Sequence, residues 1–526
     1  MTDRKILLIE PGYSNKYPPL GLMKLAQYHG PNGKRDRVKF IKGEDSSVLG
    51  EAWDRIYVTT LFSFEYPKIA ETIDFAIKVA NGRADKVFVG GIAASLMHER
   101  FRIEPRWSGI RFIKGLLTEP PALALQLDRF SDDLYANDVD GTPIEDLVPD
   151  YSILAQVSYQ YPVRDAYFGY CSRGCIRQCH FCGVPKLEGE QRDTNSLTAL
   201  VRSIDARYGP KKDLILMDNN VVASPRFKEI IAEIRDLGFT PGAMLHRRDS
   251  LPVERRVDFN QGVDARILCK DPMYLRELAS ICLRPLRIAF DHLGVRKPYE
   301  QAVRYAADAG LMELSNYMLY NFHDGPEDLF ERMRLNVALG EELGIRVWSF
   351  PMRYQPIDRP DRGHIGPKWS RYQLQSMQVI LQASHGIVSG KPDFFKRAFG
   401  DTFADYERLL AMPHDLIANR EWYEQHGDTD TLDGFEAQYR RLDGADRAEL
   451  MSLLSSGSRR HIPGLAARAT NSRIKEILGF YVPTAKSEGF RIWDERRRLA
   501  PISPSDFGVP DDERVEDSGL SHDDWE

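Results

Sequence analysis

Three closely spaced cysteines are the residues of this chain with the clearest chemistry. They are Cys175, Cys179 and Cys182, in the spacing Cys-x3-Cys-x2-Cys, and Phe181 directly precedes the last of them. Iron–sulfur clusters take cysteine thiolates as ligands, so three thiolates this close together can hold three corners of a [4Fe–4S] cube. The loop offers no protein ligand to the fourth iron, and an open iron can bind a small molecule directly. The spacing therefore predicts a cluster that acts as a catalyst.

Two plainer uses of these cysteines stay open, a structural zinc site and a ferredoxin-type cluster. Structural zinc takes four ligands, usually in separated pairs, and Cys171, four residues before Cys175, is a candidate fourth ligand. Four ligands on a single short loop would be an unusual zinc geometry. We interpret Cys171 as a small apolar residue at the end of a strand, and His180 as a solvated loop residue.

The longer run that begins Ser172-Arg173-Gly174-Cys175 and ends at Cys182 resembles a family signature. It is similar to that of the radical S-adenosylmethionine (SAM) enzymes, in the branch that carries an N-terminal cobalamin (B12)-binding-type domain. The resemblance implies that the amino and carboxylate groups of SAM chelate the open iron. It also implies that an electron from the reduced cluster splits SAM into methionine and a 5′-deoxyadenosyl radical. A reductant such as flavodoxin or ferredoxin would supply that electron.

Short apolar segments alternate with helical patterns over residues 1–130. Strands that alternate with helices predict an α/β fold with a parallel, Rossmann-like sheet. Ligands of such sheets bind at the carboxyl ends of the strands. Gly90 and Gly91 end one predicted strand, and glycine lets a backbone approach a ligand closely or form a tight turn. We predict that these two glycines contribute to cofactor binding.

The start of the chain resembles the same branch of the superfamily. The run Tyr-Pro-Pro-Leu-Gly at 17–21 and a strand that ends in Val-Gly-Gly carry this resemblance. Cobalamin domains with a histidine ligand carry Asp-x-His-x-x-Gly, and neither His29 nor His98 stands in that motif. The resemblance therefore implies a cobalamin-binding-type domain over residues 1–130 and leaves cobalamin binding itself open.

Residues 131–160 carry Asp, Gly and Pro turn patterns and are predicted to be a linker. From 161 to 365, strand candidates recur, each followed by a helix or a loop, which predicts a partial (β/α)6 barrel, as the family resemblance also implies. In α/β barrels the chemistry lies at the carboxyl ends of the strands, and the cysteine loop follows the first strand. The six candidate strands are Ala166–Tyr170, Leu214–Met217, Val257–Gln261, Leu286–Phe290, Ser315–Tyr320 and Arg346–Met352.

Polar side chains follow these strands, on the same rim of the predicted barrel as the cysteine loop. Such a set suits a ligand with an ammonium, a carboxylate and a ribose, because arginine pairs with carboxylates through two hydrogen bonds. Turns after strands also favour Asp and Asn, which is the plain structural alternative. The candidate cofactor-binding residues on this rim are Asp218, Asn219, Asn220, Gln261, Asp264, Arg266 and Asp291.

The family resemblance gives some of these residues a role. Asp218, Asn219 and Asn220 occupy the place where the superfamily binds the SAM ammonium, although its usual Gly-Gly-Glu is absent. Arg266 is interpreted as the partner of the SAM carboxylate, and Phe181 is expected near the adenine.

Beyond residue 366 the pattern changes to helices, and we expect a helical C-terminal domain over 366–504. Residues 505–526 are acidic and poor in hydrophobic residues, which predicts a disordered tail. Basic runs such as Arg459-Arg460-His461 usually solvate a surface. We expect a small-molecule substrate, and a nucleic-acid or peptide substrate stays open.

Composition limits the class of protein. A length of 526 residues predicts two or three domains, and a net charge of −6 names no partner. Six cysteines, four of them clustered, suit a reducing cytosol rather than a disulfide framework. No apolar run approaches the length of a membrane span, and no signal-peptide pattern is present, so we expect a cytoplasmic protein.

Three functional hypotheses follow. The main one is a radical SAM enzyme that modifies an unidentified substrate by hydrogen abstraction. The second is a cobalamin-dependent radical SAM methyltransferase. The third, from a different class, is a non-catalytic metal-binding protein in which the cysteines serve structure.

Overall fold

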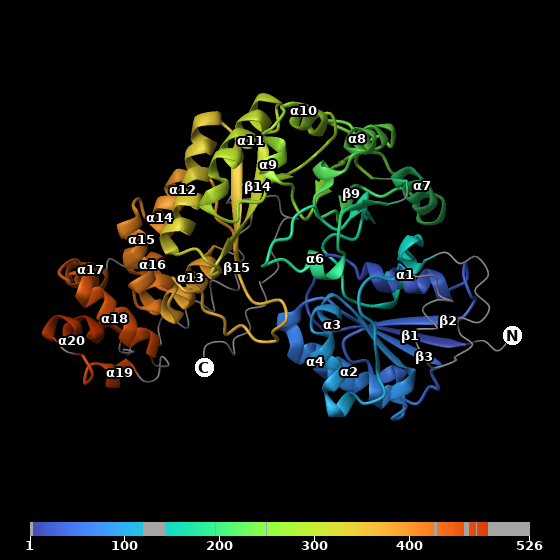
Figure 1. Ribbon diagram of the computed structural model, residues 1–526, viewed down its shortest axis with the longest axis horizontal. Coiled ribbons are helices and arrows are strands. Elements are labelled where there is room, and N and C mark those ends of the chain that lie inside the picture. The colour runs from blue at the N-terminus through green and yellow to red at the C-terminus, as the bar shows by residue number, and fades with distance from the viewer. Residues whose placement is uncertain are drawn as a thin grey trace. The chain divides into compact units, whose positions relative to one another are not determined.

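The computed structural model describes eight segments of the chain: residues 4–118, 143–194, 196–248, 250–384, 386–425, 429–456, 462–469 and 471–481 (Figure 1). It divides into two compact units. The first holds Met1–Arg287, Ala309–Leu311 and Gln355–Gly363, and the second holds Ile288–Asp308, Met312–Tyr354 and His364–Glu526. Residues 131–142 of the predicted linker, residues 482–504 of the predicted helical domain and the whole predicted acidic tail lie outside the described residues.

The first unit opens with a five-stranded parallel sheet in the order β2-β1-β3-β4-β5. Ile6 to Ile9 are fully buried because helices cover both faces, as in most parallel sheets. The predicted α/β sheet is therefore present, and its strand order reverses direction between β1 and β3, where doubly wound sheets bind ligands. The elements are β1 (Lys5–Glu10), α1 (Leu20–His29), β2 (Arg37–Lys42), β3 (Arg55–Thr60), α2 (Tyr66–Val79), β4 (Val87–Gly91), α3 (Ile92–Leu96), α4 (His98–Ile103) and β5 (Arg111–Phe112).

A second parallel sheet of the first unit carries the cysteine loop. Its order is β12-β9-β6, and the loop leaves the carboxyl end of β6. Two short antiparallel pairs were not predicted: β7 with β8, which closes the base of the cysteine loop, and β10 with β11. The strands are β6 (Ala166–Gly169), β7 (Ser172–Arg173), β8 (Arg192–Asp193), β9 (Asp213–Leu216), β10 (Met244–Leu245), β11 (Val253–Glu254), β12 (Val257–Phe259) and β13 (Leu286–Arg287). The helices are α6 (Val184–Leu187), α7 (Leu197–Tyr208), α8 (Phe227–Asp236), α9 (Ala265–Leu268) and α10 (Met273–Ala279).

The second unit contains one long parallel strand pair and then helices. β14 (Glu313–Tyr320) pairs with β15 (Arg346–Arg353), and Ile288 and Phe290 donate backbone hydrogen bonds to Ser315 and Tyr317 of β14. The predicted helical C-terminal region is thus present up to Tyr481. The helices are α11 (Arg296–Asp308), α12 (Pro326–Leu343), α13 (Arg371–Ala383), α14 (Pro392–Phe399), α15 (Phe403–Ala411), α16 (His414–Gln425), α17 (Asp430–Arg440), α18 (Gly444–Ser456), α19 (Ile462–Leu465) and α20 (Ser472–Leu478).

All six strands predicted between 161 and 365 are formed, as β6, β9, β12, β13, β14 and β15. The structure divides them between its two units, with the boundary directly after β13. The parallel strands are therefore present, and their closure into one partial barrel stays a prediction. The reason the sequence did not separate them is that all six share one strand-then-helix pattern.

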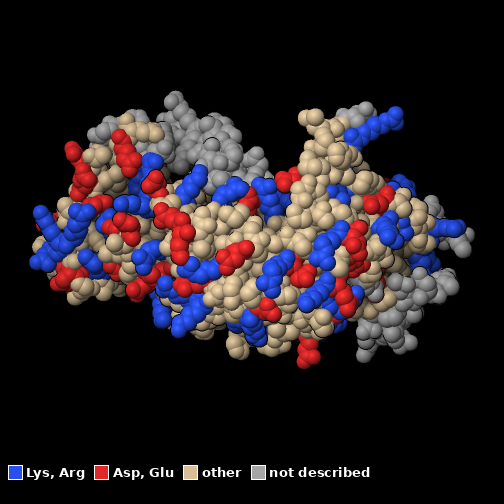
Figure 2. Space-filling view, turned by 90° about the horizontal axis from the view of Figure 1, so that it is seen from above, with Lys and Arg blue, Asp and Glu red and all other residues tan. Residues whose placement is uncertain are grey.

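Charged side chains of both signs are interspersed over the described residues of the face drawn in Figure 2. Exposed ion pairs, for example Arg304 with Glu342, occur among the described residues. RNA-binding proteins gather basic side chains on one face instead. The described part of this face therefore gives the nucleic-acid alternative no support.

Candidate active site

The cysteine loop is fixed at its start by a buried carboxylate from the neighbouring strand. Asp218 follows β9, has no exposed surface, and accepts hydrogen bonds from the backbone N–H groups of Cys171 (3.0 Å) and Ser172 (2.5 Å). It also accepts one from the Ser172 hydroxyl at 2.8 Å. Burial raises the pKa of Asp218 to about 6. The side chain expected to meet the SAM ammonium is thus occupied in holding the loop.

Asn219 takes part in a second brace of the same loop. Its Nδ2 donates to Glu188 Oε2 at 2.8 Å, and the same oxygen accepts the backbone N–H of Gly174 at 2.8 Å. Glu188 Oε1 accepts from Arg173 Nη1 at 2.9 Å. Arg173, which precedes Gly174, and Glu188, which follows α6, are therefore tied together around the cysteines.

Arg173 also connects the loop to the N-terminal sheet. It donates to Glu145, whose other partner is Lys24 Nζ of α1 at 2.8 Å. The guanidinium of Arg173 stacks on the ring of Tyr170, with its central carbon 3.3 Å from the ring centre. Lys24 and Arg173 are both buried. Glu188 and Glu145 carry this arrangement, and neither was predicted, because their partners are distant in the chain.

The three thiols themselves are partly exposed. The backbone N–H of Arg177 lies 3.4 Å from Cys175 Sγ, and that of Val184 lies 3.5 Å from Cys182 Sγ. Hydrogen bonds of this kind to sulfur tune iron–sulfur clusters. Cys171, by contrast, is buried, and burial raises its thiol pKa well above the usual value. That environment agrees with Cys171 as an apolar packing residue.

Among the described residues, no three His, Cys, Asp or Glu side chains are gathered in the manner of ligands to one metal ion. Sulfur ligands of a single zinc ion each lie about 2.3 Å from it, so they crowd together. The ligands of a [4Fe–4S] cube each bind a different iron and stand farther apart. Three thiols on one loop, two of them with N–H donors, are a donor set that fits such a cube, and the metal assignment stays a prediction.

The end of β12 contributes the other half of the site. Asp264 Oδ2 accepts from Arg177 Nε at 2.7 Å, and Asp264 Oδ1 accepts from Arg266 Nε at 2.8 Å. The backbone N–H of Asp264 donates to Asn220 Oδ1 at 3.3 Å. Three residues predicted from strand ends, Asn220, Asp264 and Arg266, are therefore brought together beside Arg177 of the cysteine loop.

Asn220 has a donor that its described surroundings do not satisfy. The residue is 2% exposed, and its Nδ2 is buried with no hydrogen-bond partner among the described residues. Buried polar groups are almost always paired, so such an atom needs an explanation. A bound acceptor, such as an oxygen of SAM, would supply the missing partner.

The predicted cofactor-binding residues Gln261, Phe181 and Asp291 differ in their exposure and in the unit to which they belong. Gln261 is exposed at the turn after β12, and Phe181 is half-buried within the cysteine loop. Asp291 belongs to the second unit, so its position relative to the loop is not described. A contact that the sequence did not predict joins Tyr17 to this rim, because the Tyr17 hydroxyl donates to Asn260 Oδ1 at 2.6 Å.

Gly90 and Gly91 form a tight corner at the end of β4. Gly91 has φ 105°, and a Cβ there would lie 2.3 Å from the Thr60 carbonyl oxygen. The Thr60 hydroxyl donates to the carbonyl of Gly90 and accepts from the N–H of Ala94, both at 2.9 Å. Gly91 is thus required by packing, whereas a Cβ at Gly90 would meet Ile113 at an ordinary 3.7 Å. A role of the two glycines in cofactor binding stays a prediction.

Helix α3, which starts after this corner, reaches the cysteine loop. A Cβ added to Gly183, the residue after Cys182, would lie 3.2 Å from Leu96 Cδ1 of α3. Figure 1 shows α3 and α6 side by side. The carboxyl edge of the N-terminal sheet and the cysteine loop are therefore neighbours within the first unit.

The two histidines in the helices beside the N-terminal sheet both make hydrogen bonds within the protein. His29 is fully buried, with Nδ1 2.8 Å from Asp36 and Nε2 2.9 Å from the Tyr57 hydroxyl. His98 Nε2 donates to the carbonyl of Phe112 at 3.1 Å. Neither is placed as an open ligand, in agreement with the missing Asp-x-His-x-x-Gly motif.

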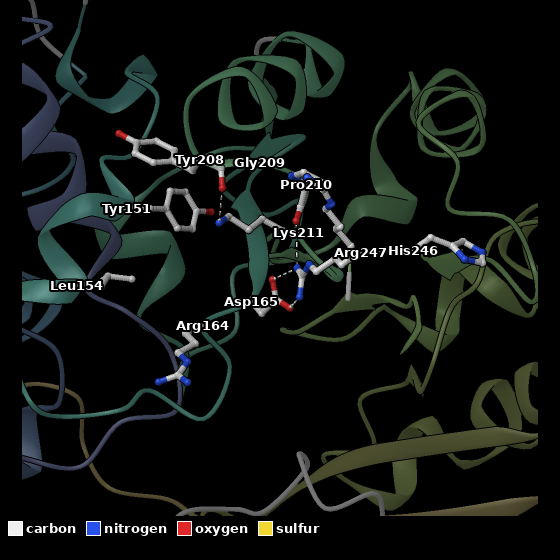
Figure 3. Close-up of a pocket in the computed structure, with 11 residues that line it drawn as sticks. Tyr151, Leu154, Arg164, Asp165, Tyr208, Gly209, Pro210, Lys211, His246 and Arg247 are labelled. Carbon is white, nitrogen blue, oxygen red and sulfur yellow. Dashed lines mark hydrogen bonds and ion pairs between the residues drawn. The ribbon is translucent and has the colours of Figure 1, made fainter. Parts of the chain in front are cut away.

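A pocket of about 780 Å³ lies elsewhere in the first unit (Figure 3). Asp165 and Lys211, at the amino ends of β6 and β9, line it. Asp165 is paired with Arg247 through two hydrogen bonds of 2.7 and 2.8 Å, and Lys211 donates to the carbonyl of Tyr208. This pocket is at the opposite ends of the strands from the cysteine loop, so it is not part of the candidate site.

The chain is similar to a curated protein over part of its length. An uncharacterized methyltransferase of Synechocystis sp. is 27% identical over 319 residues, which are 58% of this chain. The chain covers 50% of that curated relative, about half of its length. No family model matches the chain.

Three solved structures similar to the chain are described as radical SAM proteins. TsrM of Kitasatospora setae, a radical SAM methyltransferase with cobalamin and a [4Fe–4S] cluster bound, is 16% identical with a TM-score of 0.45, over 68% of this chain and 77% of that one. TsrM with tryptophan substrate and a SAM analogue is 15% identical with a TM-score of 0.46, over 95% and 100%. The cobalamin-dependent radical SAM enzyme OxsB is 12% identical with a TM-score of 0.43, over 95% and 75%.

These three solved structures are 12–16% identical to the chain. None of the described helices combines the length and the apolar character that a membrane crossing requires.

Proposed function

We propose that this protein is a radical SAM enzyme that transfers a methyl group from SAM. In this proposal a [4Fe–4S] cluster binds Cys175, Cys179 and Cys182, and a cobalamin binds at the carboxyl edge of the N-terminal sheet. The observation that carries the proposal is the braced three-cysteine loop beside that edge. The relative named a methyltransferase supports methyl transfer over the hydrogen abstraction that the sequence favoured.

The cluster supplies a low-potential electron, since iron–sulfur potentials reach about −700 mV. The chain's own residues bind and orient SAM. Arg266, whose side chain is 40% exposed, is proposed to pair with the SAM carboxylate, and the unpaired Nδ2 of Asn220 to donate to SAM. Phe181 is proposed to pack on the adenine, and Gln261 and Asp291 to contribute further contacts.

Two of the predicted SAM residues take another role in this proposal. Asp218 and Asn219 are positioning residues, because their polar atoms bond to Ser172 and Glu188 of the loop. They act on SAM only through the cysteines they hold in place. Near-attack geometry requires reacting atoms about 3–3.5 Å apart, which a loose loop would not maintain.

The strands of the N-terminal sheet differ in the side chains that they would present to the corrin ring of a cobalamin. At the ends of β1 and β2, Lys42 is buried against Glu10 (3.0 Å) and Asn15 (2.8 Å), so that part is filled. Leu61 and Phe62, beyond β3, are partly buried apolar residues. We propose that cobalamin lies over β3 and β4, near Gly90 and Gly91, without a histidine ligand from the described part of the sheet.

Hydrogen abstraction without cobalamin is the second candidate. The missing Asp-x-His-x-x-Gly motif favours it, and so does the engagement of His29 and His98 in other contacts. The two candidates share the cluster and SAM, and they differ in what becomes of SAM.

Product analysis separates these candidates. The full chain is reconstituted anaerobically with iron and sulfide and incubated with SAM, a reductant and added cobalamin. Methyl transfer leaves S-adenosylhomocysteine, whereas reductive cleavage leaves 5′-deoxyadenosine and methionine. Accumulation of S-adenosylhomocysteine together with corrinoid retention supports the proposal, and 5′-deoxyadenosine without corrinoid supports the second candidate. Zinc retention with neither product would leave the non-catalytic hypothesis.

Cysteine variants provide the matched controls. Cys175→Ala is expected to abolish both cluster uptake and SAM consumption. Cys282→Ala is the control, because Cys282 lies near the amino end of β13 and outside the loop. Equal SAM consumption by both variants would contradict the ligand assignment.

The substrate is proposed to be a small molecule. One solved structure of TsrM has its tryptophan substrate bound. For this chain, a screen of amino acids and other small metabolites with methyl-labelled SAM would identify the acceptor by transfer of the label.

A further inference from the structure

One side chain within the cysteine motif reaches across to the end of another strand. Arg177 stands between Cys175 and Cys179, and its Nε donates to Asp264 Oδ2 at 2.7 Å. Its backbone N–H lies 3.4 Å from Cys175 Sγ. The same residue therefore contacts a thiol through its main chain and a carboxylate through its side chain.

Asp264 is a fixed anchor for this contact. It is 9% exposed, and its Oδ1 accepts the backbone N–H of Arg266 at 2.9 Å as the N-cap of α9. Its own N–H donates to Asn220 Oδ1 at 3.3 Å. Arg177, by contrast, is on a loop, and 34% of its side chain is exposed. Asp264 is therefore held at more points than the Arg177 side chain.

The charges around Asp264 do not cancel. Its carboxylate faces two guanidinium groups, since Arg266 donates through Nε at 2.8 Å and Nη2 at 3.1 Å while Arg177 donates to the same group. The three side chains therefore carry a net charge of about +1 beside the cysteines. Positive charge and N–H donors near sulfur both stabilise the reduced form of an iron–sulfur cluster.

We infer that Asp264 is a positioning residue for the cluster rather than a SAM ligand. Through Arg177 it fixes the N–H···S contact at Cys175 and keeps the Arg177 charge beside the thiols. This inference rests on the proposed function only in requiring a cluster on the three cysteines. It replaces the cofactor-contact role that the sequence predicted for Asp264.

The first measurement is the release of iron to a chelator from the anaerobically reconstituted full chain. Arg177→Gln and Asp264→Asn are each expected to release iron roughly tenfold faster than the parent, the range seen when residues that orient metal ligands are removed. Because both changes break the same contact, the double variant should be no faster than the single variants. Asp165→Asn is the matched control, since it breaks the similar Asp165–Arg247 pair at the other ends of the strands (Figure 3).

The second measurement is the midpoint potential of the cluster, followed by electron paramagnetic resonance. Arg177→Gln removes a positive charge and frees the N–H donor, so the potential is expected to become more negative. Arg177→Lys keeps the charge and is expected to restore part of the shift. A role confined to folding would not produce this order of potentials.

Parent-like iron release and potential in Arg177→Gln would overturn the inference, and so would additive effects in the double variant. If Asp264→Asn does not fold, the comparison of Arg177→Gln with Arg177→Lys decides instead. Failure of the parent chain to take up any cluster would overturn the proposed function, and so the two failures are distinguishable.

Discussion

Asp218 and Ser172 are joined twice: Asp218 Oδ1 accepts the backbone N–H of Ser172 at 2.5 Å and its hydroxyl at 2.8 Å. The two residues are 46 positions apart and stand at the ends of neighbouring strands. Because Asp218 follows β9, this contact fixes the direction in which the cysteine loop begins. A carboxyl group without exposed surface is also sensitive to pH, which gives a first test.

The change Asp218→Asn is expected to remove one component of the pH dependence of stability. Burial raises the pKa of Asp218 to about 6 in the folded chain, whereas an unfolded Asp titrates near 3.9. Between these two pKa values the folded state binds one proton more than the unfolded state. This group therefore lowers the free energy of unfolding by about 3 kcal/mol as pH rises from about 4 to 6. Above that range it causes no further change in the free energy of unfolding. Urea unfolding of the cluster-free parent and variant at several pH values measures the difference. An identical slope in both proteins would contradict this assignment.

The tie between the loop and the N-terminal sheet predicts a large stability effect for Glu145→Gln. The variant leaves Lys24 buried without a carboxylate and removes one of the two carboxylates that Arg173 contacts. Loss of one partner of a buried ion pair costs about 3–5 kcal/mol. Guanidinium chloride unfolding measures it. The control is Glu99→Gln, whose pair with Arg102 is exposed, and this variant should unfold as the parent does. Equal stability of the two variants would show that Glu145 is not a brace.

Gly91→Ala tests whether the corner after β4 is required by packing. A Cβ there meets the carbonyl oxygen of Thr60 at 2.3 Å. Gly50 also has a positive φ, 82°, but nothing lies within 4 Å of the point that a Cβ would occupy there. Gly50→Ala should therefore cost only the backbone penalty of about 1–2 kcal/mol, and Gly91→Ala about 1–3 kcal/mol more for overpacking. Thermal unfolding of both variants gives the comparison, and similar melting temperatures would refute the packing argument.

Contact between the N-terminal sheet and the cysteine loop predicts a compensating pair of substitutions. Gly183→Val should clash with Leu96, lower the free energy of unfolding by about 1–3 kcal/mol and reduce iron uptake. Leu96→Ala in the same chain should recover both, because it removes the side chain that the valine meets. The coupling energy from the double-mutant cycle should be about 0.5–3 kcal/mol. Additive losses in the free energy of unfolding would mean that residues 96 and 183 do not interact.

The sequence was sufficient where a local pattern determines the structure. The cysteine spacing is a property of one loop, and the alternation of apolar strands with helices predicted the N-terminal parallel sheet and all six later strands. The polar residues after β9 and β12 follow neighbouring parallel strands, whose carboxyl ends meet at one edge. Asn220, Asp264 and Arg266 lie together for that reason.

The sequence was insufficient where burial decides what a polar group does. Asp218 and Arg266 are equally plausible ligands from their positions in the chain. The fold encloses Asp218 completely, whereas 40% of the Arg266 side chain is exposed. Glu145 and Glu188 were not predicted because acids in turns are common, and their partners become visible only when distant segments meet.

Glu145 has one further consequence. The same carboxylate serves a lysine of the N-terminal sheet region and an arginine of the cysteine loop, so the two regions are not independent modules that can be exchanged. A chimera that takes its first 118 residues from another protein would need a basic residue at the position of Lys24. Recombination between this chain and a related one should therefore give folded proteins only where Lys24 and Glu145 are inherited together.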